Sequence, residues 1–160
     1  MANSYKILYF IGISILLVAT DWFTKMLAKK YLFYERAKDY FNGIFILDYA
    51  ENKGAALSLG SNLPENQAFW VLQFLPAFIL AGLLLFIYSQ IKTLIVWHII
   101  MYAAIFSGGF ANLFDRFQNN RHVIDFMVVK LGGFQTGIFN FADMFISFGV
   151  LGLLFGNFKK

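Results

Sequence analysis

Four long apolar segments decide what this chain can fold into. They cover about residues 7–27, 68–88, 94–114 and 138–156. Each is close to the roughly 20 residues that an α-helix needs to cross a hydrocarbon core about 30 Å thick. Because lipid offers the backbone no hydrogen-bond partners, a helix is the expected conformation of such segments. The sequence therefore predicts an integral membrane protein, mainly α, built as a bundle of four transmembrane helices.

The composition supports this prediction and excludes several classes of site. Hydrophobic residues make up 59% of the 160 residues and charged residues only 14%, against about 25% charge in soluble domains. This length fits one membrane-embedded domain over residues 1–160. With no cysteine and two histidines, we expect no disulfide, no metal site and no cofactor. The basic residues are scattered, so we expect no nucleic acid, and we interpret Lys25, Lys29 and Lys30 as contacts to lipid headgroups.

The connections between the four segments are unequal in length. Residues 89–93 form a tight link, whereas residues 28–67 and 115–137 are long. Helices that alternate in direction must place both long loops on one side of the membrane. The pairs Asn42-Gly43 and Gly132-Gly133 are typical of hairpin turns, so a small β-sheet on the membrane surface is expected in these loops.

The distribution of basic residues leaves the orientation open. The side with short connections holds Lys6, Lys92, Lys159 and Lys160 in very few residues, while the looped side holds nine Lys and Arg over much more chain. Charge density favours cytoplasmic termini under the positive-inside rule, whereas the raw count does not. Lys6 before the first apolar segment also resembles a secretory signal, but no small-residue cleavage pattern precedes Asp21.

Polar side chains at membrane depth are costly, so each is a functional candidate. An alternating bundle brings six of them to the looped face: Asp21, Asn112, Asp115, Arg116, Asn140 and Asp143. Asp143 stands about five residues into its segment, on the order of 7 Å below the helix start at 1.5 Å per residue. Asp125 is expected in the loop just before the fourth helix. Its apolar neighbours could bring its carboxylate down onto the polar side chains of this face.

Two acids brought together in such a site suggest a specific chemistry. Two carboxyl groups in a low-dielectric site tend to share one proton. One of Asp125 and Asp143 can then act as a general base on water while the other, protonated, polarises a peptide carbonyl. A serine nucleophile, Ser58 or Ser107, is disfavoured because neither histidine is expected near the acids.

Purely structural interpretations of the same acids remain open. Asp125 could be an ordinary loop acid, and Asp143 could be an acid at a helix start, favoured by the helix dipole. Asp115 could form an interfacial ion pair with Arg116, and Asp21 could pair with Lys25 four residues on.

Five short sequence blocks, in order along the chain, resemble the signature blocks of bacterial lipoprotein signal peptidases, also called signal peptidase II. The blocks are DWFTK (21–25), NKGAALS (52–58), GGFANLFDR (108–116), VIDF (123–126) and FNFAD (139–143). Together they frame nearly the whole chain, and five in order are far more specific than any one alone.

The resemblance implies an aspartic endopeptidase of the bacterial cytoplasmic (inner) membrane. It implies removal of signal peptides from diacylglyceryl-modified prolipoproteins, with a cut before the lipidated cysteine. Asp125 and Asp143 would be the catalytic pair. The substrate-binding and site-shaping residues would be Asp21, Asn52, Gly54, Asn112, Arg116 and Asn140.

With this resemblance we expect a monomer that contacts membrane lipids, both termini in the cytoplasm and an active site toward the periplasmic face. The loop 28–67 is expected to cover the site as a lid. The alternatives are a small membrane transporter, with polar residues distributed across the membrane depth, and an assembly subunit that packs through glycine-rich helices.

Overall fold

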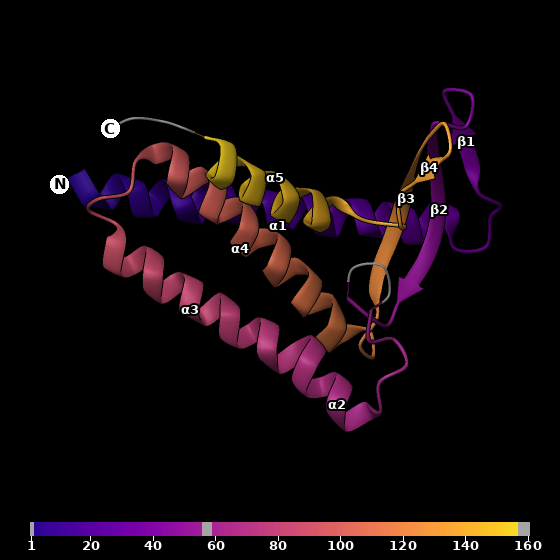
Figure 1. The fold of residues 1–160 in the computed structure, drawn as a ribbon, viewed down its shortest axis with the longest axis horizontal. Helices are drawn as coiled ribbons and strands as arrows, with labels where there is room; N and C mark the ends of the chain where they lie inside the picture. Colours follow the sequence, from indigo (N-terminus) through magenta and orange to yellow (C-terminus); the bar gives the residue numbers. More distant parts are fainter. Residues whose placement is uncertain (1, 56–58, 157–160) are drawn as a thin grey trace.

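The computed structural model describes residues 2–55 and 59–156, and most of them are helical (Figure 1). Ser58, considered above as a nucleophile, lies outside this range, as do Ala56 and Leu57. The helices are α1 (Ala2–Leu32), α2 (Glu65–Phe69), α3 (Leu75–Gln90), α4 (Val96–Gln118) and α5 (Phe141–Phe155). A π-helical turn, η2 (Trp70–Phe74), joins α2 to α3 in one continuous helical stretch.

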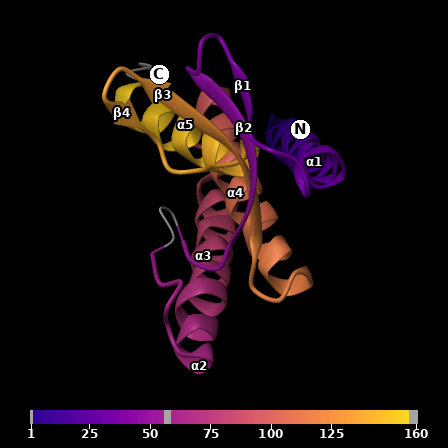
Figure 2. The ribbon, with the colours of Figure 1, turned by 90° about the vertical axis from the view of Figure 1, so that its right-hand side faces the viewer.

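Among the described residues, three helical stretches are long and apolar enough to cross a membrane: Ser4–Leu32, Glu65–Gln90 and Val96–Gln118. Helix α4 is central, because it packs against α1, α3 and α5 (Figure 2). Large apolar side chains cover the outer faces of the helices, for example Leu8, Phe78 and Leu154, each about 70% exposed. Such outward apolar surface suits lipid rather than water, so the expected mainly helical membrane fold is confirmed.

The fourth apolar segment forms a shorter helix than expected. Helix α5 has 15 residues, which at 1.5 Å per residue is about 22 Å long. The segment was expected to be helical from residue 138, but Phe139 is extended and bridges to Met127. Asn140 then caps the helix, so its first turn begins at Phe141.

Close contact between α4 and α5 depends on glycine. A Cβ atom added to Gly108 would overlap the backbone oxygen of Ala142, and one added to Gly149 would lie 2.7 Å from the backbone oxygen of Met101. Only hydrogen fits at these two positions. These glycines allow the backbones of α4 and α5 to approach closely.

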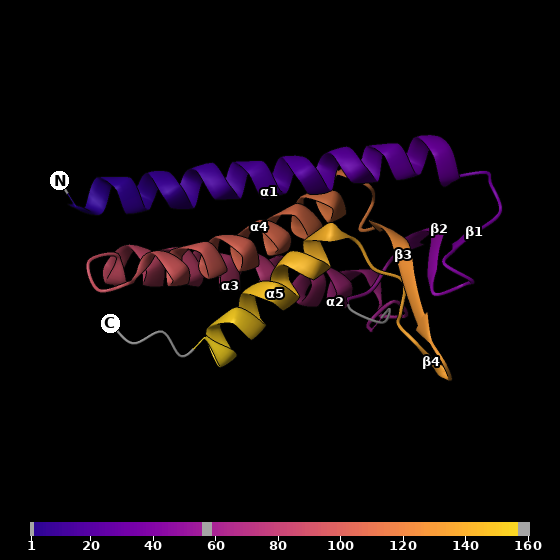
Figure 3. The ribbon, with the colours of Figure 1, turned by 90° about the horizontal axis from the view of Figure 1, so that it is seen from above.

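Both long connections contribute to one antiparallel sheet of order β1-β2-β3-β4. The strands are β1 (Lys38–Tyr40), β2 (Phe45–Asn52), β3 (Val123–Leu131) and β4 (Phe134–Gln135). Both predicted turns are present, and Gly43 and Gly132 have positive φ angles of 80° and 58°, which glycine adopts at no steric cost. The sheet lies at the end of the helices that is remote from the start of α1 (Figures 1 and 3).

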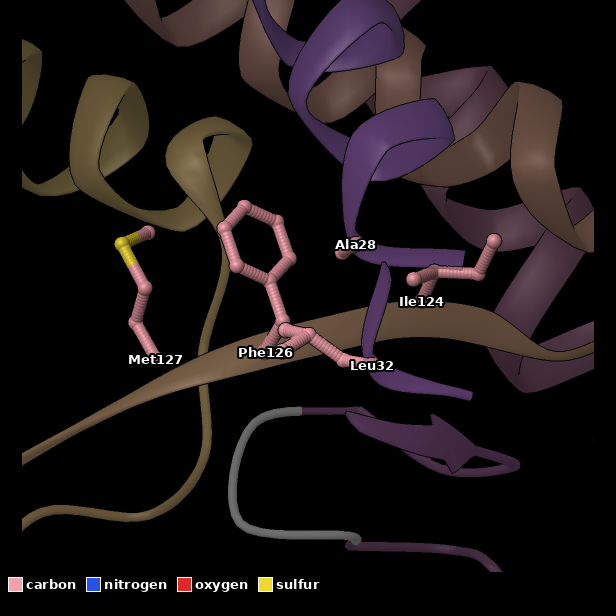
Figure 4. Packing of buried hydrophobic residues seen from close by; sticks show 5 residues of the cluster. All are labelled: Ala28, Leu32, Ile124, Phe126 and Met127. Carbon is pink, nitrogen blue, oxygen red and sulfur yellow. The ribbon is translucent and has the colours of Figure 1, made fainter. Parts of the chain in front are cut away.

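A small apolar core attaches the sheet to the first helix. Ala28 and Leu32, in the last turns of α1, are buried with three residues of β3: Ile124, Phe126 and Met127 (Figure 4). This contact fixes β3 across the ends of the helices. The third residue of β3, Asp125, is thereby placed beside α4 and α5.

Candidate active site

A cavity of about 510 Å³ opens where the helical stretch of η2 and α3 meets α4, α5 and β3. One part of its lining is polar and includes Asn52, Asn112, Arg116, Asp125 and Asp143. Another part is apolar and includes Val71, Leu72, Pro76 and Ile146. The cavity therefore places two carboxylates beside an apolar wall.

Asp125 reaches this cavity from a strand and not from a loop as expected. It is the third residue of β3, pairs with Ala50 of β2, and is only 2% exposed. The sequence prediction was wrong because β3 continues back to Val123 by pairing with the distant strand β2. Asn52 Nδ2 donates to one carboxylate oxygen at 3.0 Å, and Asn140 Nδ2 donates to the other at 2.6 Å.

The environment of Asp125 favours its protonated form. Burial, with a smaller contribution from the negative charge of Asp143, raises the pKa of Asp125 to about 6. The hydrogen bonds from Asn52 and Asn140 and the charge of Lys25 act in the opposite direction. A carboxyl group with this pKa retains a proton over part of the physiological pH range, as an acid catalyst must.

Asp143 lies in the first turn of α5 and not five residues into the helix. Asn140 is the N-cap, and its side chain accepts from the backbone N–H of Asp143 at 3.0 Å. In return, the backbone N–H of Asn140 donates to the Asp143 carboxylate at 3.1 Å. This reciprocal capping box fixes the Asp143 side chain and satisfies donors at the helix start, so the acid is both a helix-start residue and a wall of the cavity.

Asn112 and Arg116, one turn apart on α4, complete the polar part of the lining. Asn112 Nδ2 donates to Asp143 at 2.8 Å. Arg116 donates to the backbone oxygens of Asn112 and Gly54, at 2.9 and 2.8 Å. Gly54 is buried, and its N–H donates to the side chain of Asn52. Arg116 thus ties the loop after β2 to the mouth of the cavity.

Asp21 does not line this cavity, but it lies in a buried ionic cluster behind it. Lys25 Nζ is 2.7 Å from Asp21 and 2.8 Å from Asp115. The other oxygen of Asp21 accepts from the backbone N–H of Ala142 at 2.8 Å. The pairing of Asp21 with Lys25 was one of the open alternatives, whereas Asp115 pairs with Lys25 and not with Arg116.

The sequence interpretation also placed Lys25 in the wrong environment. A headgroup contact was expected, yet Lys25 is only 3% exposed. The signal was its spacing of four residues from Asp21 within an apolar run, which places both charges on one helix face. The apolar wall was also missed, because no pattern in the sequence predicts the π-helical turn that contributes Val71 and Leu72.

Ser107 and the two histidines take no part in the cavity. Ser107 is fully buried and donates to the backbone oxygen of Ala103 at 2.6 Å. Neither Ser107 nor either histidine is in the cavity lining. Within residues 2–55 and 59–156, no group of three or more acidic or histidine side chains is arranged to bind a metal ion.

Known proteins are similar to this chain in sequence and in fold. Residues 13–159 match the family model described as signal peptidase (SPase) II. A lipoprotein signal peptidase of Francisella tularensis subsp. novicida is 36% identical over 152 residues, covering 93% of this chain and 90% of that protein. A lipoprotein signal peptidase of Streptococcus agalactiae is 29% identical over 148 residues, covering 92% and 90%.

The fold is also similar to that of solved membrane enzymes. A bacterial membrane enzyme determined by the in meso method at 2.3 Å resolution superposes with a TM-score of 0.76 at 23% identity, covering 92% of this chain and 85% of the other. A second, at 1.9 Å resolution, gives a TM-score of 0.75 and covers 94% and 93%. The family match extends over nearly the whole sequence, and the chain therefore belongs to the signal peptidase II family of aspartic-type membrane peptidases.

Proposed function

We propose that this protein removes signal peptides from diacylglyceryl-modified prolipoproteins, cutting before the lipidated cysteine, with Asp125 and Asp143 as the catalytic pair. The observation that carries the proposal is that Asn140 holds both carboxylates at one cavity, one through its side chain and one through its backbone. Family membership supplies the reaction class, the removal of signal peptides from prolipoproteins.

The two acids divide the work of hydrolysis. Asp143 is held by N–H bonds from Asn112 and Asn140, and it takes a proton from the attacking water as the general base. Asp125, whose pKa is raised to about 6, gives its proton to the carbonyl oxygen as the water oxygen bonds to the carbonyl carbon. The proton on Asp143 then passes to the leaving nitrogen. As the C–N bond breaks, one hydroxyl of the intermediate returns its proton to Asp125, and the products are a carboxylic acid and the free amine of cysteine.

The remaining lining residues position the substrate in this proposal. The apolar wall of Val71, Leu72, Pro76 and Ile146 accommodates lipid chains and the apolar part of the signal peptide. Asn52, Gly54 and Arg116 hold the loop after β2 at the cavity, beside the space that a peptide backbone would occupy. Asp21 acts indirectly, because its carboxylate holds the N–H of Ala142 at the start of α5.

The arrangement of the helices supports a proposed orientation. The start of α1 and the end of α5 lie at the end of the bundle that is remote from the sheet (Figure 3). With the termini in the cytoplasm of a bacterial inner membrane, the sheet and the cavity lie at the periplasmic face. We propose that the protein acts there as a monomer in contact with lipid.

The transporter alternative requires polar residues along the whole membrane depth. The buried charged residues instead gather at one end of the bundle, where Lys25 forms ion pairs with Asp21 and Asp115. Such a closed cluster offers an ion no continuous path. The assembly-subunit alternative gives no reason for two acids to converge on Asn140.

Cleavage of paired substrates tests the proposed specificity. Purified protein in detergent is incubated with a diacylglyceryl-modified prolipoprotein and with the same precursor lacking the modification, and the products are identified by mass spectrometry. We expect a new amino terminus at the lipidated cysteine and at least 100-fold slower cleavage of the unmodified precursor. Equal cleavage of both, or a cut elsewhere, would contradict the proposal.

A further inference from the structure

A buried polar cluster behind the cavity joins α1 to α4. Asp21 and Lys25 are one turn apart on α1, and Asn112 and Asp115 are one turn apart on α4, so each pair shares a helix face. All four side chains are at most about one-tenth exposed. The Lys25 ammonium lies at the centre, within 3.0 Å of an oxygen atom from each of the other three.

These contacts place the ammonium group among three oxygen acceptors. Two belong to the carboxylates of Asp21 and Asp115, and the third is Oδ1 of Asn112 at 3.0 Å. Lysine carries three donors and no acceptor. The atom of Asn112 that faces Lys25 must therefore be the oxygen, and the amino group must face the other way.

The amino group of Asn112 faces a proposed catalytic acid. Its Nδ2 donates to Asp143 Oδ1 at 2.8 Å. If the amide were rotated by half a turn, its N–H groups would point at the ammonium and its oxygen at the carboxylate. Both contacts would then be repulsive. Asn140 Nδ2 also donates to Asn112 Oδ1, at 3.1 Å, so Lys25 and Asn140 together select the one orientation in which Asn112 donates to Asp143.

We propose that Lys25 is a positioning residue for catalysis: it orients the side-chain amide of Asn112, which in turn holds Asp143 in its working position. This inference rests on the proposed function of Asp143. It differs from a purely structural role of Lys25, because an ion pair that only joined α1 to α4 would need Asp21 and Asp115 but no bond to Asn112.

The test compares Lys25→Met, which keeps the length of the side chain but has no donor, with Lys29→Met at an exposed position one turn later on α1. Cleavage of the modified prolipoprotein is measured for both, and thermal unfolding in detergent confirms the fold. We expect Lys25→Met to lower kcat by about 10- to 100-fold, typical of outer-shell partners. Its KM should stay within about twofold, and Lys29→Met should match the unmodified protein.

Two further variants separate positioning from folding. Lys25→Met leaves two buried carboxylates without their cation, Asp21 and Asp115, which could unfold the single variant. Combining it with Asp115→Leu removes one of them, while Asp21 retains its bond from the Ala142 N–H, and the double variant should show the same loss of kcat. Lys25→Arg retains charge and donors and should recover activity to within about tenfold of the unmodified protein. A folded Lys25→Met protein with normal kcat, a change in KM alone, or Lys25→Arg as impaired as Lys25→Met would overturn the inference.

An Asp143→Asn variant in the same assay separates this inference from the proposed function. If Asp143→Asn is inactive while folded Lys25→Met is fully active, only the role of Lys25 is rejected. If Asp143→Asn cleaves at the normal rate, the catalytic pair itself is wrong and the inference fails with it.

Discussion

Asn140 contacts both acids of the active site, donating to Asp125 from its side chain at 2.6 Å and to Asp143 from its backbone N–H at 3.1 Å. It is fully buried and also caps helix α5. One residue therefore fixes where the helix starts and how far apart the two carboxylates lie.

Substitution of Asn140 can separate these two roles. Serine retains the side-chain N-cap, but its short side chain does not reach Asp125. Alanine loses both the side-chain cap and the bond to Asp125. We expect Asn140→Ser and Asn140→Ala each to lower kcat by at least tenfold, with Asn140→Ala also less stable than Asn140→Ser by about 1 kcal/mol. Cleavage kinetics and thermal unfolding provide the two measurements, and normal kcat in Asn140→Ser would rule out a role of this bond in catalysis.

The acid role of Asp125 predicts how activity depends on pH. Its pKa is raised to about 6 in the free protein, so the proton needed on the carbonyl oxygen is lost as the pH rises through this value. We expect kcat/KM to fall by about tenfold per pH unit above this pKa. The kinetics are measured from pH 4 to 9 in one detergent. A kcat/KM that keeps rising to pH 8 would indicate a single ionised base instead of a pair that shares a proton.

The contact between α4 and α5 predicts a stability difference between two glycines. The Cβ of Gly108→Ala would overlap the backbone oxygen of Ala142, whereas nothing lies within 4 Å of a Cβ at Gly82 in α3. We expect Gly108→Ala to cost about 1–3 kcal/mol of stability, and Gly82→Ala to be neutral or stabilising by up to about 1 kcal/mol. Thermal unfolding of both variants tests this prediction. If Gly108→Ala is as stable as Gly82→Ala, α4 and α5 can separate at no cost.

Much of the fold could be predicted because it follows from local patterns. Apolar length predicted the helices, and the glycine turns at Gly43 and Gly132 predicted both hairpins. The start of α5 was predicted too early, since an apolar run does not show where a cap such as Asn140 ends an extended segment. The π-helical turn at Trp70–Phe74 has no recognisable sequence signal.

The site was harder to predict because its geometry depends on contacts between distant residues. The convergence of polar residues on one face followed from helix direction alone. The strand position of Asp125 depends on its pairing with Ala50, 75 residues earlier. The burial of Lys25 depends on Asp115, which α4 brings to it. The spacing of Lys25 from Asp21 indicated the first of its two ion pairs, but nothing near Lys25 in the sequence indicates the second.

The most direct experiment on the catalytic pair is a gel-shift assay of the purified protein on a diacylglyceryl-modified prolipoprotein, with chelator present, beside Asp125→Asn and Asp143→Asn. Each variant removes one acid and keeps the side-chain size, so the fold should persist and can be confirmed by thermal unfolding. We predict cleavage by the unmodified protein despite the chelator and at least 1000-fold less by either variant. Full activity in either folded variant would contradict the assignment of Asp125 and Asp143 as the catalytic pair.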